Sequence, residues 1–145
     1  MKPIQKKQSG QSLVELAISL MVILLLLLGA VEFSLALFQY VTIRDAAQEG
    51  AIYASIEPTD EDGIKYRAQA AASDVVNIDL ATVAVSLNGD DYCEGTTSGT
   101  PNSITVSITF AHPISFPLVG PMIGSNTINL TSSVTNTILR PICDP

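Results

Sequence analysis

Residue types that carry chemistry in proteins are sparse in this chain. Its only histidine, His112, precedes a proline, and no GxSxG, HExxH or P-loop spacing occurs. Asp60, Glu61 and Asp62 stand together. The ligand spacing of a calcium loop is missing around them, so a solvated turn is the simpler interpretation. We therefore expect neither an enzyme, with no catalytic residues, nor a bound metal or cofactor.

Two glutamates, Glu15 and Glu32, stand in a segment that is otherwise apolar. No charged residue occurs from Leu16 to Val31, and after Glu32 the apolar run resumes from Phe33 to Ile43. A carboxylate in lipid costs roughly 2.5–3.5 kcal/mol at mid-bilayer and less near the interface, so each calls for a partner. Glu15 would lie one turn into a lipid-crossing helix. Glu32 would lie about 25 Å further along, near the outer interface, where water or a partner side chain could satisfy it.

The element that positions these glutamates is one long helix over 11–56. No proline occurs between Gln11 and Ile56, so nothing covalent interrupts it. At 1.5 Å per residue, the stretch from Leu16 to Ile43 would span roughly 42 Å, more than the roughly 30 Å hydrocarbon core of a bilayer. A leucine-rich run of this kind has no polar face to present to water. We expect a helix that crosses a membrane once and emerges beyond it, rather than the core helix of a soluble domain.

The charge distribution predicts the orientation of this helix. The chain has 7 basic and 14 acidic residues and a formal charge of −7. Three lysines precede the apolar run, and the first basic residue after it is Arg44. The N-terminus is therefore expected to be cytoplasmic and the bulk of the chain translocated. An acidic exposed domain argues against nucleic acid and against adsorption to anionic lipid headgroups.

Both cysteines, Cys93 and Cys143, lie on the side expected to be translocated, where disulfides persist. Pairing them would close a loop of roughly 50 residues and contribute about 4 kcal/mol in the chain-entropy model. Neither cysteine belongs to a CxxC. Two free thiols or half of a metal site are the alternatives to the disulfide that we expect.

The front of the apolar segment resembles a class III (type IV prepilin-like) signal. A basic leader over 1–10 ends in Gly10, and Glu15 is the fifth residue after it. The resemblance implies that a membrane-embedded prepilin peptidase cuts between Gly10 and Gln11. The apolar helix would be retained after this cleavage, unlike an ordinary signal peptide.

A longer stretch is similar to the TadE-like pseudopilins of tight-adherence (Tad, type IVc) pilus systems. The similarity covers 10–54 and includes GAVEF at 29–33 and AAQEGA at 46–51. Leu16 stands where the family commonly has Phe, and Ser34-Leu35 where it more often has Gly-Arg. The resemblance implies assembly with other pilin subunits on a pilus assembly platform. It also implies that Glu15 faces the new N-terminal amine of a neighbouring subunit.

A stripe of small residues follows on the same helix, and such stripes let another helix approach closely. This stripe could pack on the chain's own sheet or between subunits, and both could hold on different faces. Its members are Ala47, Gly50, Ala51 and Ala54.

The remainder, 57–145, predicts a small extracytoplasmic α+β domain. A turn over 57–63 precedes an alanine-rich helix over 64–76, and strands are expected within 77–87 and over 103–110 and 126–139. The proline-rich apolar stretch 112–125 is expected to be a loop that either covers the sheet or forms a contact surface. The expected fold is one helix packed on an antiparallel sheet of about three strands, preceded by the long N-terminal helix. The residues expected to point inward from the second strand are Ile104, Val106, Ile108 and Phe110.

Two classes of function fit these features. The favoured one is a minor pilin or pseudopilin, assembled into or priming a Tad-type surface pilus for adhesion and biofilm formation. The alternative is a single-pass membrane-anchored extracytoplasmic binding module that does not polymerise. The Gly10/Glu15 junction favours the first, because a plain signal anchor does not need it. The expected location is the cytoplasmic membrane, with the N-terminus inside, and the surface pilus after assembly.

Overall fold

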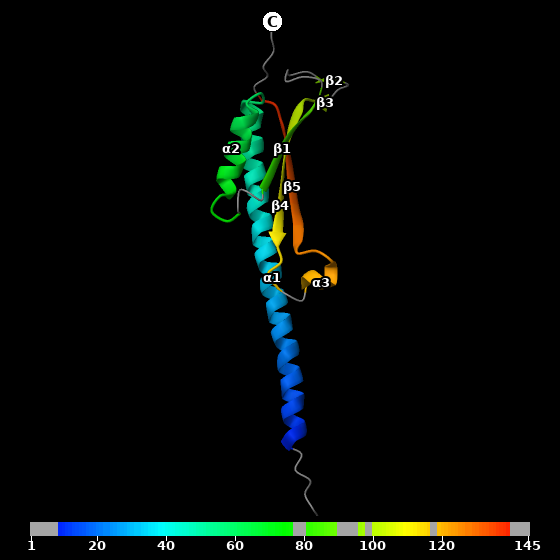
Figure 1. The fold of residues 1–145 in the computed structure, drawn as a ribbon. Coiled ribbons are helices and arrows are strands. Elements are labelled where there is room, and N and C mark those ends of the chain that lie inside the picture. Colours follow the sequence, from blue (N-terminus) through cyan, green and yellow to red (C-terminus); the bar gives the residue numbers. More distant parts are fainter. Residues whose placement is uncertain (1–8, 77–80, 90–95, 98–99, 117–118, 140–145) are drawn as a thin grey trace, which may run out of the picture.

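The computed structural model describes residues 9–76, 81–89, 96–97, 100–116 and 119–139. A long N-terminal helix is followed by a second helix and by a three-stranded antiparallel sheet packed against both (Figure 1). The predicted α+β class is confirmed. In chain order the elements are α1 (Ser9–Ile56), α2 (Glu61–Ala72), β1 (Ala81–Asn88), β2 (Thr96–Thr97), β3 (Thr100–Pro101), β4 (Ser103–Pro113), α3 (Val119–Ile123) and β5 (Thr127–Thr137).

Helix α1 is a single helix of 48 residues, or roughly 72 Å at 1.5 Å per residue. Its N-terminal half stands alone, whereas α2 and the sheet lie beside its C-terminal half (Figure 1). It ends at Ile56 because Glu57 precedes Pro58, and the residue before a proline disfavours the helical conformation.

A capped corner joins α1 to α2. Asp60 is the N-cap of α2: its Oδ1 accepts a hydrogen bond from the N–H of Gly63 at 3.0 Å, and its Oδ2 accepts from the Tyr53 hydroxyl at 2.7 Å. These two donors hold the pKa of the Asp60 carboxyl below its usual range, the Tyr53 hydroxyl having the larger effect. Because the cap lies at Asp60, α2 begins at Glu61, inside the turn predicted over 57–63 and three residues before the predicted start at 64. It ends at Ala72, before the predicted end at 76.

The main sheet has the order β1-β4-β5, with β4 in the centre and both neighbours antiparallel to it. Strand β4 continues three residues beyond the predicted end, to Pro113. Strands β2 and β3 form a separate antiparallel pair between β1 and β4 in the chain. Two-residue strands are too short to show a period, which is why the sequence pattern misses them.

The hydrophobic core lies between one face of the sheet and the two helices. Helix α1 packs against β4 and β5, and α2 packs against α1 and β1. The four side chains predicted to point inward from β4 are all buried. The C-terminal half of α1 is therefore part of the domain core, although the sequence suggests a boundary at 56/57. Its buried apolar residues are Ile43, Ala46, Ala47, Ala51 and Ala54.

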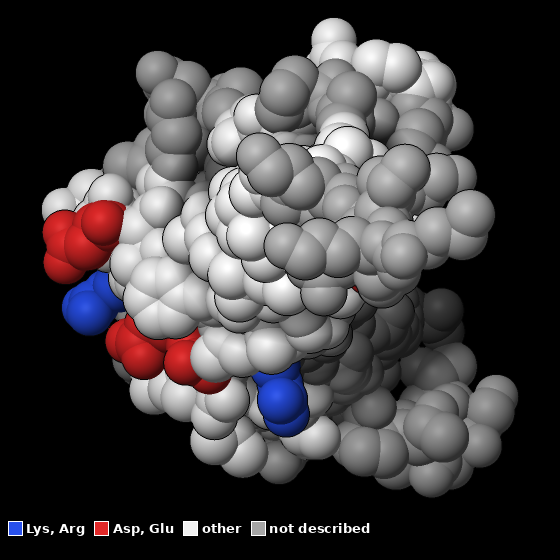
Figure 2. Space-filling view, turned by 90° about the horizontal axis from the view of Figure 1, so that it is seen from below, with Lys and Arg blue, Asp and Glu red and all other residues white. Residues whose placement is uncertain are grey.

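The other face of the sheet carries hydroxyl side chains. Thr105 bonds Thr135 across β4 and β5 at 2.7 Å, and Thr109 bonds Thr131 at 3.2 Å. Among the described residues, every charged side chain lies in α1, α2 or the turns that flank α2. Figure 2 looks at the N-terminal end of α1, and the charged side chains visible there gather toward one side of the molecule. The strands contribute no formal charge except what His112 carries when protonated.

Candidate functional site

The N-terminal half of α1, residues 10–31, is an apolar rod that no other part of the described chain covers, and we call it the bare half of α1. The helix from Gly10 to Ile56 is long and apolar enough to cross a membrane, and its most apolar window has a mean hydropathy of 2.7 with no part buried in the protein. In water this surface would be strongly unfavourable. One long apolar N-terminal helix of this kind is consistent with a single-pass membrane anchor.

The predicted cleavage site and Glu15, the first of the two acids predicted to lie in the membrane, are at the start of this rod. A Cβ added at Gly10 would meet nothing within 4 Å, so the fold itself does not require glycine there. Gln11 and Glu15 line one shallow groove together with Val14 and Ile18, one turn apart on the same helix face. Within the described part of the chain, Glu15 makes no hydrogen bond or ion pair. It is free to bind a partner.

The predicted small-residue stripe lies inside the domain. Ala47, Gly50, Ala51 and Ala54 are all buried. A Cβ added at Gly50 would lie 3.0 Å from the Cβ of Ala68 on α2 and 3.2 Å from Cγ1 of Val106 on β4. The stripe thus joins α1 to both α2 and the sheet of its own chain.

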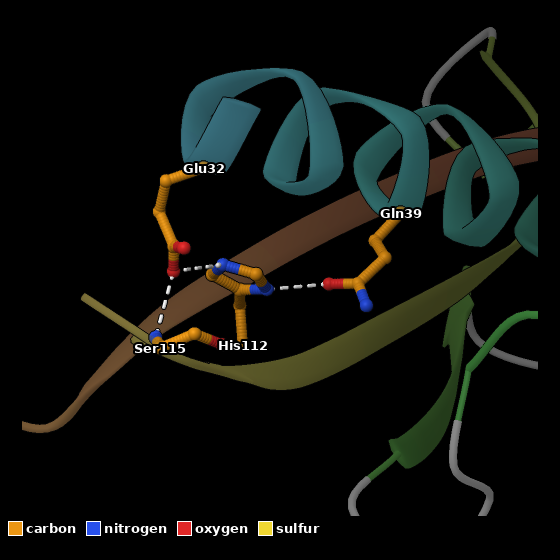
Figure 3. A network of polar contacts seen from close by, with 4 residues as sticks. All are labelled: Glu32, Gln39, His112 and Ser115. Atoms are coloured by element: carbon orange, nitrogen blue, oxygen red, sulfur yellow. Dashed lines mark hydrogen bonds and ion pairs between the residues drawn. The ribbon is translucent and has the colours of Figure 1, made fainter. Parts of the chain in front are cut away.

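The second acid, Glu32, connects α1 to the far end of the sheet (Figure 3). Its Oε1 accepts a hydrogen bond from the backbone N–H of Ser115 at 2.9 Å and lies 3.4 Å from Nε2 of His112. Nδ1 of His112 in turn forms a hydrogen bond with Oε1 of Gln39, which lies two turns after Glu32 on the same face of α1. We call Glu32, Gln39, His112 and Ser115 the clasp. The clasp therefore provides Glu32 with polar neighbours from its own chain.

The clasp is largely shielded from solvent. Only 5% of the His112 side chain and 18% of the Glu32 side chain are exposed. Nδ1 of His112 is hydrogen-bonded to Gln39, and which of the two groups donates depends on the histidine tautomer. Nε2 is buried and makes no hydrogen bond, although it lies 3.4 Å from the Glu32 carboxylate.

Sequence reasoning missed His112, Gln39 and Ser115 as members of a site. The signal was present in the alternation of β4, since the next position after Phe110 on its inward face is His112. Glu32 and Gln39 are seven residues apart, two helical turns, and so share a face of α1. Neither pattern says that these two faces meet.

Several predicted features lie outside the described residues. Cys93 and Cys143 are among them, as is most of the leader over 1–10, so the disulfide stays a prediction. Among the residues that are described, no group of three His, Cys, Asp or Glu side chains could hold a metal ion.

Comparison with known proteins gives one finding. Residues 10–51 match the family model of the TadE-like protein. No curated protein and no solved structure matches the chain significantly. The match covers the bare half of α1, Glu15, Glu32 and most of the small-residue stripe, and it ends within α1. The N-terminal region of this chain, residues 10–51, is therefore similar to TadE-like proteins.

Proposed function

We propose that this chain is a minor pilin or pseudopilin of a Tad-type pilus system, stored in the membrane through α1 and then assembled into, or priming, a surface pilus. The observation that carries the proposal is the family match over 10–51. The match includes the half of α1 that the domain leaves uncovered. An uncovered apolar helix suits both storage in lipid and lateral packing against other subunits. The role is structural, in adhesion and biofilm formation, and involves no catalysis.

Processing is the first step of the proposed mechanism. A prepilin peptidase would cut between Gly10 and Gln11, leaving Gln11 as the new N-terminus. Because a side chain at Gly10 would meet nothing in this fold, Gly10→Val should fold normally. A defect in that variant would then reflect the peptidase, which must approach the backbone closely. Mass spectrometry of the membrane-extracted protein should find a mature start at Gln11, and only the full-length chain in Gly10→Val.

The two intramembrane acids have different roles in this proposal. Glu15 is unpaired within the described chain, and on assembly it would face the N-terminal amine of a neighbouring subunit. An ion pair there relieves the cost that either charge would bear alone in lipid. Glu32 already accepts a hydrogen bond from the backbone N–H of Ser115 and lies 3.4 Å from His112, so its role in this proposal is to link the domain to the helix.

A pair of variants tests this division. Glu15→Leu should insert, fold and keep its domain, but should fail to co-purify with pili or with the assembly platform. Glu32→Leu should instead loosen the domain, which limited proteolysis would detect. The rival function is an anchored binding module that does not polymerise. It predicts that the chain is not cleaved and that Glu15→Leu has no effect on piliation. An intact Met1 start in cells that contain the peptidase, together with normal piliation by Glu15→Leu, would refute the proposal.

A further inference from the structure

The end of the sheet nearest the bare half of α1 carries exposed apolar side chains. There β4 ends at Pro113, the chain runs through α3, and β5 begins at Thr127. A hydrogen bond of 2.9 Å from the N–H of Ile114 to the carbonyl of Asn126 closes this loop. Ile123 is 53% exposed and Ile128 is 43% exposed. We define the apolar tip as the described residues Ile114, Phe116, Pro121, Ile123 and Ile128.

The apolar tip carries no compensating charge. The sequence from Ser103 to Leu139 contains no Asp, Glu, Lys or Arg. The charged side chains of the described residues belong to α1, α2 and the turns that flank α2. In Figure 2, which views the molecule from this end, the visible charged side chains gather toward one side of the molecule. A patch without charge can leave water without the cost of desolvating an ion.

The clasp fixes the height of the apolar tip along α1. Ser115, which directly follows Ile114, donates its N–H to Glu32. The tip therefore lies at the level of Glu32, and Figure 1 shows α3 at the end of the sheet from which α1 continues alone. Any membrane surface near Glu32 is also near the tip.

The length of the uncharged helix places a membrane surface at that level. From Leu16 to Glu32 the helix rises roughly 24 Å, which is less than the roughly 30 Å hydrocarbon core of a bilayer. With Glu15 at one boundary of the core, the other boundary falls about 5 Å beyond Glu32, and tilting of the helix moves it still further. The base of the domain then reaches the lipid.

We propose that the apolar tip sits in the interfacial layer of the membrane from which α1 emerges, as a second contact with lipid beside the helix. This inference rests on the membrane-stored state of the proposed function. The tip is level with the exposed apolar surface of α1, so the two contacts share one lipid boundary. The clasp fits this setting, because a carboxylate near hydrocarbon is supplied with a backbone N–H and an imidazole in place of water.

A two-point contact has a consequence for assembly. A helix alone leaves a domain free to rotate about the helix axis, whereas a helix and a tip fix its orientation on the membrane. Extraction of the subunit into a filament would then have to remove the tip from lipid as well as α1. The contact depends on apolar burial rather than charge, so an uncharged lipid suffices.

Tryptophan substitution can test the depth of the tip, because the chain contains no tryptophan. The full-length chain would be placed in phosphatidylcholine vesicles at a low protein-to-lipid ratio, with lipids brominated on their acyl chains as quenchers. Ile123→Trp reports the tip. Leu24→Trp reports the bare half of α1, and Tyr66→Trp reports an exposed position on α2. Circular dichroism would confirm that all three variants keep the helix content of the parent.

The three reporters separate the possible outcomes. We expect strong quenching for Leu24→Trp, none for Tyr66→Trp, and quenching with a blue-shifted emission for Ile123→Trp. If Ile123→Trp behaves like Tyr66→Trp while Leu24→Trp is quenched, the tip does not touch lipid and the inference is overturned. A blue shift at Ile123→Trp without quenching would also overturn it, since another protein chain would then cover the tip. Absence of quenching at Leu24→Trp would refute the membrane-stored state itself.

Discussion

Removing α1 should unfold the domain that follows it, even though the sequence suggests a boundary at 56/57. The test compares the fragment 57–145 with the longer fragment 32–145. The longer one retains the clasp and the buried side of α1, and it lacks the apolar half that the family match covers. Both fragments would be refolded in the same mild detergent, because the part of α1 that follows Glu32 still exposes apolar side chains on one side.

The size of the effect follows from the buried side chains. Ile43 is fully buried, which is worth about 1.5–3 kcal/mol, and the methyl groups of the buried α1 alanines add about 0.8 kcal/mol each. The facing side chains of β4, β5 and α2 lose the same cover, which brings the loss to roughly 10 kcal/mol. A small domain has a total stability of about 5–15 kcal/mol, so 57–145 should not remain folded.

Urea unfolding followed by circular dichroism, together with the dispersion of amide signals in NMR, would measure this. We expect a cooperative transition and dispersed signals for 32–145, and neither for 57–145. Adding a synthetic peptide of residues 32–56 to the short fragment should restore part of the dispersion. A cooperative transition of 57–145 at the same urea concentration as 32–145 would show that α1 is not part of the core.

Three further predictions concern single positions. Gly50→Val should lower the free energy of unfolding by about 2–3 kcal/mol through overpacking, measured by urea denaturation in micelles. Gly29→Val, whose new Cβ would meet nothing within 4 Å, is the control that should leave the midpoint unchanged. Reduction of the predicted Cys93–Cys143 bond should cost about 4 kcal/mol and lower the melting temperature, and alkylation of both thiols without reductant would contradict the bond. The depressed pKa of Asp60 means that its ionised form stabilises the fold above the unfolded pKa, near 3.8, and that this stability is lost as the pH falls through the folded pKa. Asp60→Asn, which can still cap α2, should therefore show a weaker loss of stability below about pH 4, and an identical pH profile would refute this cause.

The sequence by itself determined the features that depend on neighbours along the chain. Absence of proline from Gln11 to Ile56 indicates the extent of α1, and the proline at 58 indicates its end. The alternation of Ile and Val with Ser and Thr correctly identifies the buried face of β4. The start of α2 was predicted less accurately than the end of α1. The helix begins at Glu61, directly after its N-cap Asp60, and not at residue 64.

Only the tertiary structure decided how these elements use one another. Glu32 meets Ser115 across 83 positions of sequence, and Gln39 meets His112 across 73. Each of these residues has an ordinary place in its own local pattern, as a glutamate in an apolar helix or a histidine at the end of a strand. Their meeting depends on how far β4 extends along α1. A periodic pattern specifies which face of an element is buried, but it carries no information on which residue of another element will lie opposite.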